Sequence, residues 1–156
     1  MGSSKTDLSI SRLIRAPRAR VWQAWAEPRN FEKWWIPEPM TCRVIRMDLR
    51  AGGGFETQMS ENGTDFTPHL DSCFLEIVPQ ERIVFTTVLS AGWQPVDPWL
   101  AMTAIMTMQD EDGGTRYIAR ALHRNPEEKR KHDEMGFYQG WGSAIDQLAR
   151  LVEAVP

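Results

Sequence analysis

Three side chains that can carry chemistry alternate along one predicted strand near the middle of the chain. His69, Asp71 and Cys73 lie two residues apart in the segment PHLDSCFLEIV, so a strand would point them to the same face. Leu75 and Ile77 continue this series, and we therefore expect the shared face to be buried. A buried His–carboxylate pair can position a proton, which makes His69 and Asp71 candidate proton-transfer residues. The alternative is a polar strand end exposed to solvent, and the pattern favours this second interpretation.

His123 is the third candidate for proton transfer. It lies nine residues before His132 and on a different predicted element, so the two histidines form no recognisable metal pair. Cys42 and Cys73 have no C-x-x-C spacing, and we expect free thiols in a reducing compartment. The chain has no nucleophile elbow, phosphate-binding loop, zinc-protease helix or dinucleotide fingerprint. We therefore predict no metal and no cofactor, and we favour a binding protein over an enzyme.

The seven tryptophans of the chain indicate a second kind of site. Trp34 and Trp35 end a predicted short helix and precede Pro37, which disfavours helical geometry in the residue before it. Trp93 and Trp99 lie in the proline-containing loop SAGWQPVDPW, where an aromatic side chain more often forms a rim or a lid than a core. Ligand sites prefer aromatic and apolar linings, so we expect these four side chains to border the mouth of a cavity.

Two neighbouring predicted strands present small or flexible side chains on one face. The two-residue period of AMTAIMTM groups Met102, Ala104, Met106 and Met108. On the following strand we expect Tyr117, Ala119, Ala121 and His123 to point inward, because the opposite face carries Arg116 and Arg120. Methionine adapts to irregular gaps, so this composition indicates either a loosely filled interior or an ordinary core.

The last segment is predicted to be one amphipathic helix over residues 126–154, about 40 Å long. Asn125 and Pro126 suit its start, and its apolar stripe includes Phe137 and Trp141. The helix also contains Gly136, Gly140 and Gly142, each of which costs about 1 kcal/mol relative to alanine. Close packing against the sheet is the favoured explanation, and space for a ligand is the alternative.

The order of elements predicts an α+β fold. One strand is followed by two short helices, a run of about six strands with turn signals between them, and the long helix. The simplest way to bury both apolar faces is to curl the antiparallel sheet around that helix. We expect a single domain over residues 8–155, preceded by a flexible segment at residues 1–7.

Composition excludes several classes of partner. The 156 residues are 42% hydrophobic and 25% charged with a net charge of −3, and no basic stripe is present that could neutralise the phosphates of a nucleic acid. No apolar run approaches the roughly 20 residues that a membrane span requires. We therefore expect a cytoplasmic protein without a nucleic-acid partner or a membrane span, and the exposed faces of the sheet leave a homodimer open.

Five segments resemble one family in the order in which they occur. The first, RLIRAPRARVWQAWAEPRNFEKWW, is similar to the opening of the SRPBCC, or START-like, helix-grip superfamily. The next three resemble its strand corner and two hairpin strands: MDLRAGGGFETQM, FLEIVPQERIVFT and GGTRY. The last, HDEMGFYQGWGSAIDQLARLV, resembles its closing helix. The similarity is to the subgroup named for the activator of the ATPase of heat-shock protein ninety, and it spans the chain from about Leu8 to Val152.

This resemblance implies a curved antiparallel sheet that grips the C-terminal helix, with a cavity between them. Members of the superfamily bind lipids, sterols, polyketides and other apolar molecules, and a few cyclise or hydrolyse them. The chain departs from the family where a glycine is common before FLEIVP, because it has Asp71, Ser72 and Cys73 there. No catalytic motif of the superfamily transfers to this chain, so the likeness supplies no activity.

The sequence therefore predicts a protein that binds a small apolar molecule. The alternatives are an enzyme that acts on such a molecule and a regulatory module with a chaperone partner. The expected ligand-binding residues come from both faces of the grip: Trp34, Trp35, His69, Asp71, Cys73, Trp93, Trp99, Met102, Met106, Tyr117, Phe137 and Trp141.

Overall fold

The chain folds into one twisted antiparallel sheet with helices against its concave face. The computed structural model describes residues 5–154. Seven strands hydrogen-bond in the order β1-β9-β8-β5-β4-β3-β2. Their bounds are β1 (Asp7–Ile14), β2 (Thr41–Met47), β3 (Gly54–Ser60), β4 (Thr67–Val78), β5 (Arg82–Thr86), β8 (Thr103–Glu111) and β9 (Gly114–Leu122). A short two-stranded ribbon pairs β6 (Leu89–Ser90) with β7 (Gln94–Pro95).

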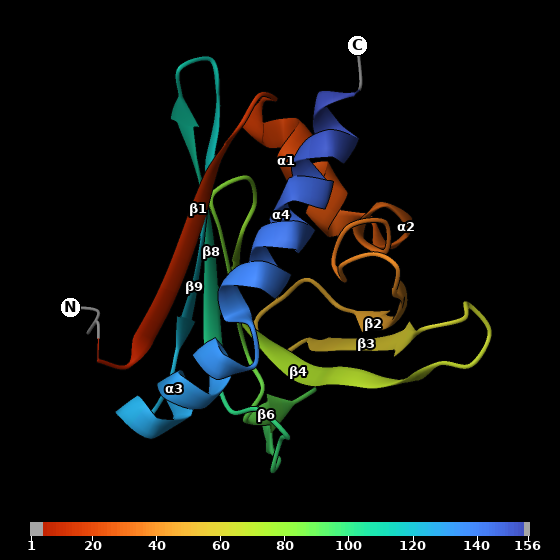
Figure 1. The fold of residues 1–156 in the computed structure, drawn as a ribbon, viewed down its shortest axis with the longest axis vertical. Helices are drawn as coiled ribbons and strands as arrows, with labels where there is room; N and C mark the ends of the chain where they lie inside the picture. The colour runs from red at the N-terminus through yellow and green to blue at the C-terminus, as the bar shows by residue number, and fades with distance from the viewer. Residues whose placement is uncertain (1–4, 155–156) are drawn as a thin grey trace.

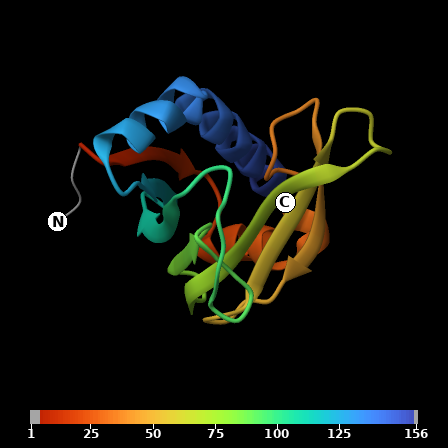
Figure 2. The same ribbon diagram turned by 90° about the horizontal axis from the view of Figure 1, so that it is seen from below.

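The sheet changes direction strongly from one edge to the other. In Figure 1, β1, β8 and β9 run along the long axis of the molecule, whereas β2, β3 and β4 run across it. Consecutive strands from β2 to β5 are antiparallel neighbours, as are β8 and β9, while β1 adds to the far side of β9 with Ile10 opposite Ala119. The view from below in Figure 2 shows the helices lying over the hollow side of this curved sheet. The predicted α+β helix-grip class is confirmed.

Two short helices follow β1. The first is α1 (Arg18–Ala26), and the second is α2 (Pro28–Phe31). The second helix is shorter than predicted, because hydrogen-bonded turns rather than helix carry the chain through Trp34 and Trp35; both of their backbone N–H groups donate to the carbonyl of Phe31. These turns point the two indoles toward the interior.

The C-terminal segment is two helices rather than the single helix predicted over residues 126–154. They are α3 (Pro126–Glu134) and α4 (Phe137–Glu153). Asn125 caps α3 by accepting from the backbone N–H of Glu128, as its sequence indicates. The helix then stops at Gly136, whose φ of 99° lies outside the right-handed helical region. The following helix α4 crosses the sheet alone (Figure 1) and is about 25 Å long.

Only part of the predicted inward face of β4 points inward: Ile77 packs against the core as expected, whereas Asp71 does not. Leu70 and Phe74 belong to the hydrophobic core, while Asp71 is exposed. Register shifts on either side of β4, opposite β3 near His69 and opposite β5 near Leu75, mark β-bulges. A bulge inserts one extra residue and changes which side chains face inward, so the simple alternation used for the prediction fails along this strand.

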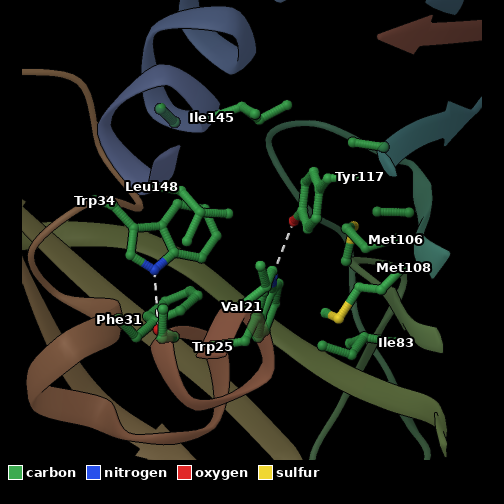
Figure 3. Packing of buried hydrophobic residues seen from close by; sticks show 14 of the residues in the cluster. Val21, Trp25, Phe31, Trp34, Ile83, Met106, Met108, Tyr117, Ile145 and Leu148 are labelled. Carbon is green, nitrogen blue, oxygen red and sulfur yellow. Dashed lines mark hydrogen bonds between the residues drawn. The ribbon is translucent and has the colours of Figure 1, made fainter. Parts of the chain in front are cut away.

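The inward faces of β8 and β9 are as predicted. The four residues of β8 and its approach, Met102, Ala104, Met106 and Met108, are all buried, and so are Tyr117, Ala119, Ala121 and His123 on and after β9. Trp25, Phe31, Trp34 and further aromatic side chains complete the core from the helical side, as Figure 3 shows. The core thus lies between the sheet and α1, α2 and α4.

The ends of the predicted domain fall partly outside the described residues. The strand β1 begins at Asp7, so the segment predicted to be flexible overlaps this strand at one residue. Residues 1–4 and 155–156 lie outside the described range. No helix within residues 5–154 is long and apolar enough to cross a membrane.

Candidate ligand-binding cavity

A cavity of about 210 Å³ lies between the sheet and the C-terminal helices. Its walls come from the turn after α2, from the bulged start of β4, from β8 and β9, and from α3 and α4. The lining residues are Trp34, Trp35, Ile36, Pro37, His69, Leu70, Trp99, Leu100, Met102, Met106, Tyr117, Ala119, His132, Met135, Gly136, Phe137, Gly140, Trp141, Ala144 and Ile145.

No aspartate, glutamate, lysine or arginine lines the cavity among the described residues. Its only ionisable side chains are His69, His132 and Tyr117. Burial lowers the pKa of His69 to about 4, and burial together with the neighbouring His123 lowers the pKa of His132 to about 4. Complete burial raises the pKa of the Tyr117 phenol. The cavity is therefore electrically neutral at pH 7.

Aromatic rings form one end of the cavity. Trp34 is fixed by its indole N–H, which donates to the backbone carbonyl of Ala24 at 2.9 Å. Trp25 donates to the hydroxyl of Tyr117 at 2.9 Å and so holds the phenol at the wall (Figure 3). The ring of Trp35 stacks on Phe31 with 4.8 Å between centroids. Its indole nitrogen is the one fully buried side-chain nitrogen or oxygen of the described residues that has no hydrogen bond.

The mouth of the cavity is formed by Trp99 and by the end of α3. Trp99 is 64% exposed, yet its indole N–H donates to the backbone carbonyl of His69 at 2.8 Å. Met135 is also exposed. These two side chains border an outer hollow of about 330 Å³ that includes the charged residues Glu128, Lys131 and Glu134. A molecule that enters would pass charged groups outside and meet none inside.

Most of the ligand-binding residues predicted from the sequence lie at this cavity. They are Trp34, Trp35, His69, Trp99, Met102, Met106, Tyr117, Phe137 and Trp141. Three others lie elsewhere. Asp71 points to solvent, and Cys73 is buried away from the cavity on a strand against which β6 packs. Trp93 lies over Gly52, where a Cβ added to the glycine would be 2.8 Å from the indole ring.

The predicted proton-transfer pair is not formed. The Nδ1 atom of His69 lies 3.0 Å from the hydroxyl of Thr57 and makes no hydrogen bond with Asp71. The bulge at the start of β4 separates the two side chains by turning His69 to the cavity and leaving Asp71 outside. His123 does not line the cavity itself, and its ring instead contacts His132.

Several lining residues were not predicted as site residues: Ile36, Pro37, Leu70, Leu100, Ala119, His132, Met135, Gly136, Gly140, Ala144 and Ile145. The strongest sequence signal for them was the group of helical glycines. Gly142 is close-packed, because a Cβ there would lie 3.1 Å from Nη2 of Arg12. Gly140 lines the cavity, and a Cβ there would meet no atom within 4 Å. The two explanations offered for these glycines thus apply to different residues.

The described residues contain no cluster of three or more histidine, cysteine, aspartate or glutamate side chains that could hold a metal ion. Cys42 and Cys73 are both buried free thiols. Burial, and to a smaller extent the charge of Glu32, raises the pKa of Cys42 to about 12. Thiolates are the reactive form of cysteine, so Cys42 is inert at neutral pH.

With this geometry in view, comparison with known proteins places the chain. Residues 15–153 match the family described as Activator of Hsp90 ATPase homolog 1-like protein. The chain belongs to this family. A crystal structure from Nitrosomonas europaea is 37% identical, with a TM-score of 0.87 and coverage of 97% of this chain and 96% of that one. The resemblance stated from the sequence is confirmed.

Two further structures of lower identity share the family fold. A protein from Mycobacterium smegmatis is 26% identical, with a TM-score of 0.79 over 97% of this chain and 93% of that one. DynU16, a protein of the dynemicin biosynthetic locus, is 16% identical with a TM-score of 0.64; the match covers 96% of this chain and 48% of DynU16. That likeness concerns the fold alone. No curated protein matches the chain.

Proposed function

We propose that this protein binds a small, largely apolar and uncharged molecule in the cavity between the sheet and α4. The observation that carries the proposal is the cavity itself: it is enclosed by aromatic, methionine and alanine side chains and lined by no charged group. An ionised ligand would lose its hydration there without gaining a partner charge. An uncharged ring system would instead bury its surface against Trp34, Trp141 and Phe137.

The volume limits the size of the ligand. A cavity of about 150 Å³ accommodates benzene, so a cavity of about 210 Å³ suits a molecule of one or two rings, or a short acyl chain, unless side chains at the mouth move. Trp99 and Met135 are the exposed side chains at that mouth, and they would have to admit the ligand.

The helix α4 keeps this space open at a cost to its own stability. Gly140 lies on the same face as Phe137 and Ala144 and borders the cavity. Glycine in a helix interior costs about 1 kcal/mol relative to alanine, and here a Cβ would meet no atom within 4 Å. Packing therefore does not require glycine at this position, and the missing side chain leaves its volume to the cavity.

An enzymatic role has less support than binding. The proton-transfer pair that would have favoured it is absent, since Asp71 points away from the cavity. The family description also names an ATPase activator. A chaperone-regulatory role would depend on the surface of the protein rather than on its cavity, and it is therefore distinguished by the experiment below.

The test is a thermal-shift titration with uncharged one- and two-ring aromatic compounds and their carboxylate analogues. At a hundredfold excess over its dissociation constant, a ligand should add about 2.7 kcal/mol of stability, which corresponds to a rise of roughly 5–10 °C for a chain of this size. The uncharged compounds should produce such a shift, and the carboxylates should not.

Two matched variants of α4 locate the site. Gly140→Leu places a side chain in the cavity and should abolish the ligand-induced shift, while Ser143→Leu adds the same side chain on the exposed face of the helix and should retain it. Absence of any saturable shift in the wild type, or an equal shift in both variants, would contradict the proposal. A specific interaction with a chaperone ATPase that Gly140→Leu leaves intact would then favour the regulatory role.

A further inference from the structure

His123 and His132 form a hydrogen-bonded chain that ends at the cavity. His123 follows β9 and His132 lies in the last turn of α3, and both are buried, with 7% and 4% of their surface exposed. Nε2 of His123 lies 2.9 Å from Nδ1 of His132. On its other side, Nδ1 of His123 lies 2.7 Å from the backbone carbonyl oxygen of Thr6.

The carbonyl of Thr6 fixes which nitrogen of His123 carries the proton. A carbonyl oxygen only accepts hydrogen bonds, so Nδ1 of His123 must be the donor. A neutral imidazole has a single N–H group. Nε2 of neutral His123 therefore has a lone pair, which is directed at His132.

The same reasoning extends one ring further. Because Nε2 of His123 accepts, Nδ1 of His132 donates and carries the only proton of that neutral ring. The remaining nitrogen of His132, Nε2, must then be an unprotonated acceptor. The low pKa of His132, about 4, is consistent with a ring that is neutral at physiological pH.

This acceptor is free to meet a ligand. No side chain among residues 5–154 makes a hydrogen bond to Nε2 of His132. Among these residues, the only fully buried side-chain nitrogen or oxygen without a partner is the indole nitrogen of Trp35, so Nε2 of His132 is not fully buried. It therefore keeps some accessible surface. The ring contacts Phe137 and Trp141 edge-on, at 5.2 and 5.9 Å between centroids, and His132 is one of the residues that line the cavity.

We propose that His132 selects ligands that carry a hydroxyl group, by accepting a hydrogen bond at Nε2 from an uncharged alcohol or phenol. His123 acts as a positioning residue, because it holds His132 in the tautomer that accepts. This inference rests on the proposed binding function and specifies its ligand class. A carboxylate would place its own lone pairs against that of Nε2 and find no cation in the cavity.

The ligand class is tested with three probes of similar shape: 1-naphthol, 1-methylnaphthalene and 1-naphthoate. Calorimetric titration of the wild type at pH 8 should give the order naphthol, methylnaphthalene, naphthoate. One hydrogen bond should make naphthol bind roughly three- to tenfold tighter than its methyl counterpart. In His132→Phe this preference should disappear, while both uncharged compounds still bind.

The tautomer is tested without any ligand. Imidazole ¹⁵N NMR of the wild type at pH 8 should show a protonated Nδ1 and an unprotonated Nε2 on His132. His123→Gln keeps an amide that can accept from Nδ1 of His132 and should preserve both this signature and the preference for naphthol. His123→Phe cannot accept, so the fixed tautomer and the preference should both be lost.

The outcomes separate the inference from the function on which it rests. If His132 carries its proton on Nε2, or if naphthol and methylnaphthalene bind equally well, the inference is overturned and the proposed binding function stands. If none of the three probes binds, both are overturned. Tightest binding of naphthoate would contradict the neutral cavity and the selection of a hydroxyl group together.

Discussion

At the scale of single residues, burial rather than charge pairing determines the chemistry of the cavity. His69 has no carboxylate partner and makes its side-chain hydrogen bond to the hydroxyl of Thr57. A ring in this position is neutral because removal from water disfavours its charged form. His69 therefore forms a polar, uncharged part of the cavity wall on the sheet, and His132 does the same on the helical layer.

The lowered pKa values of His69 and His132 allow us to predict how the free energy of unfolding depends on pH. Their pKa values are about 4 in the folded protein against about 6.5 in an unfolded chain, so between these values the unfolded state binds more protons. The free energy of unfolding should therefore fall as the pH is lowered from about 6.5 toward 4, by roughly 2 kcal/mol or more in total.

Urea denaturation at several pH values between 7.5 and 4.5 measures this loss. His69→Gln removes one of the two titrating groups and should make the dependence shallower above pH 5, where most carboxylates remain ionised. A free energy of unfolding that stays constant from pH 7 to 5 would show that the rings are not buried as neutral groups.

At the scale of elements, the break between α3 and α4 gives the cavity its last wall. The chain changes direction at Gly136, which lies between α3 and α4 and has a positive φ of 99°. As a result, Met135 lies at the mouth while Phe137 is buried in the core. The two side chains are only two residues apart, and the change of direction at Gly136 lets α3 end at the mouth of the cavity while α4 crosses the sheet.

Gly136→Ala should destabilise the protein by about 1–2 kcal/mol, because L-residues pay this cost in left-handed geometry. Space is not the reason, since a Cβ would find its nearest neighbour, Oε1 of Gln139, at 3.6 Å. Gly136→Asn should cost less, because asparagine tolerates such a conformation better. Chemical denaturation of the two variants provides the comparison, and equal stability of wild type and Gly136→Ala would contradict the assigned strain.

At the scale of the whole molecule, one buried amide joins the C-terminal helix to the N-terminal half. The side-chain N–H groups of Gln147 donate to the backbone carbonyls of Trp34 and Ile36, at 3.1 and 3.0 Å. Its side-chain oxygen accepts from the backbone N–H of Glu38 at 2.7 Å. This residue thereby fixes the turn that carries Trp34 and Trp35 against α4, and so fixes the aromatic end of the cavity.

Gln147→Leu should lower the free energy of unfolding by about 2–4 kcal/mol, because it leaves backbone groups of the turn without partners in a buried site. Ligand affinity should fall as well, since the turn positions two cavity walls. The neighbouring exposed side chain of Asp146 makes a surface ion pair with Arg12, and Asp146→Ala should change stability by less than about 1 kcal/mol. Similar losses in the two variants would contradict the role given to Gln147.

The sequence by itself determined the features that depend on local periodicity. The alternation along residues 102–108 and 117–123 identified the buried faces of β8 and β9, because a regular strand repeats every two residues. The aromatic and methionine lining followed from composition combined with those faces. The curl of the sheet followed from the need to bury both apolar faces, and the family resemblance independently implied both that curvature and a cavity.

Tertiary structure alone decided the polar part of the site. The inward face of β4 depends on bulges that arise from its pairing with β3 and β5, and such pairing is set by residues distant in the sequence. The contact between His123 and His132 likewise exists because the chain breaks at Gly136, so that α3 packs beside β1 while α4 crosses the sheet. Hydrogen bonds of this kind join elements whose relative placement is fixed by the packing of the whole core, and no local pattern records them.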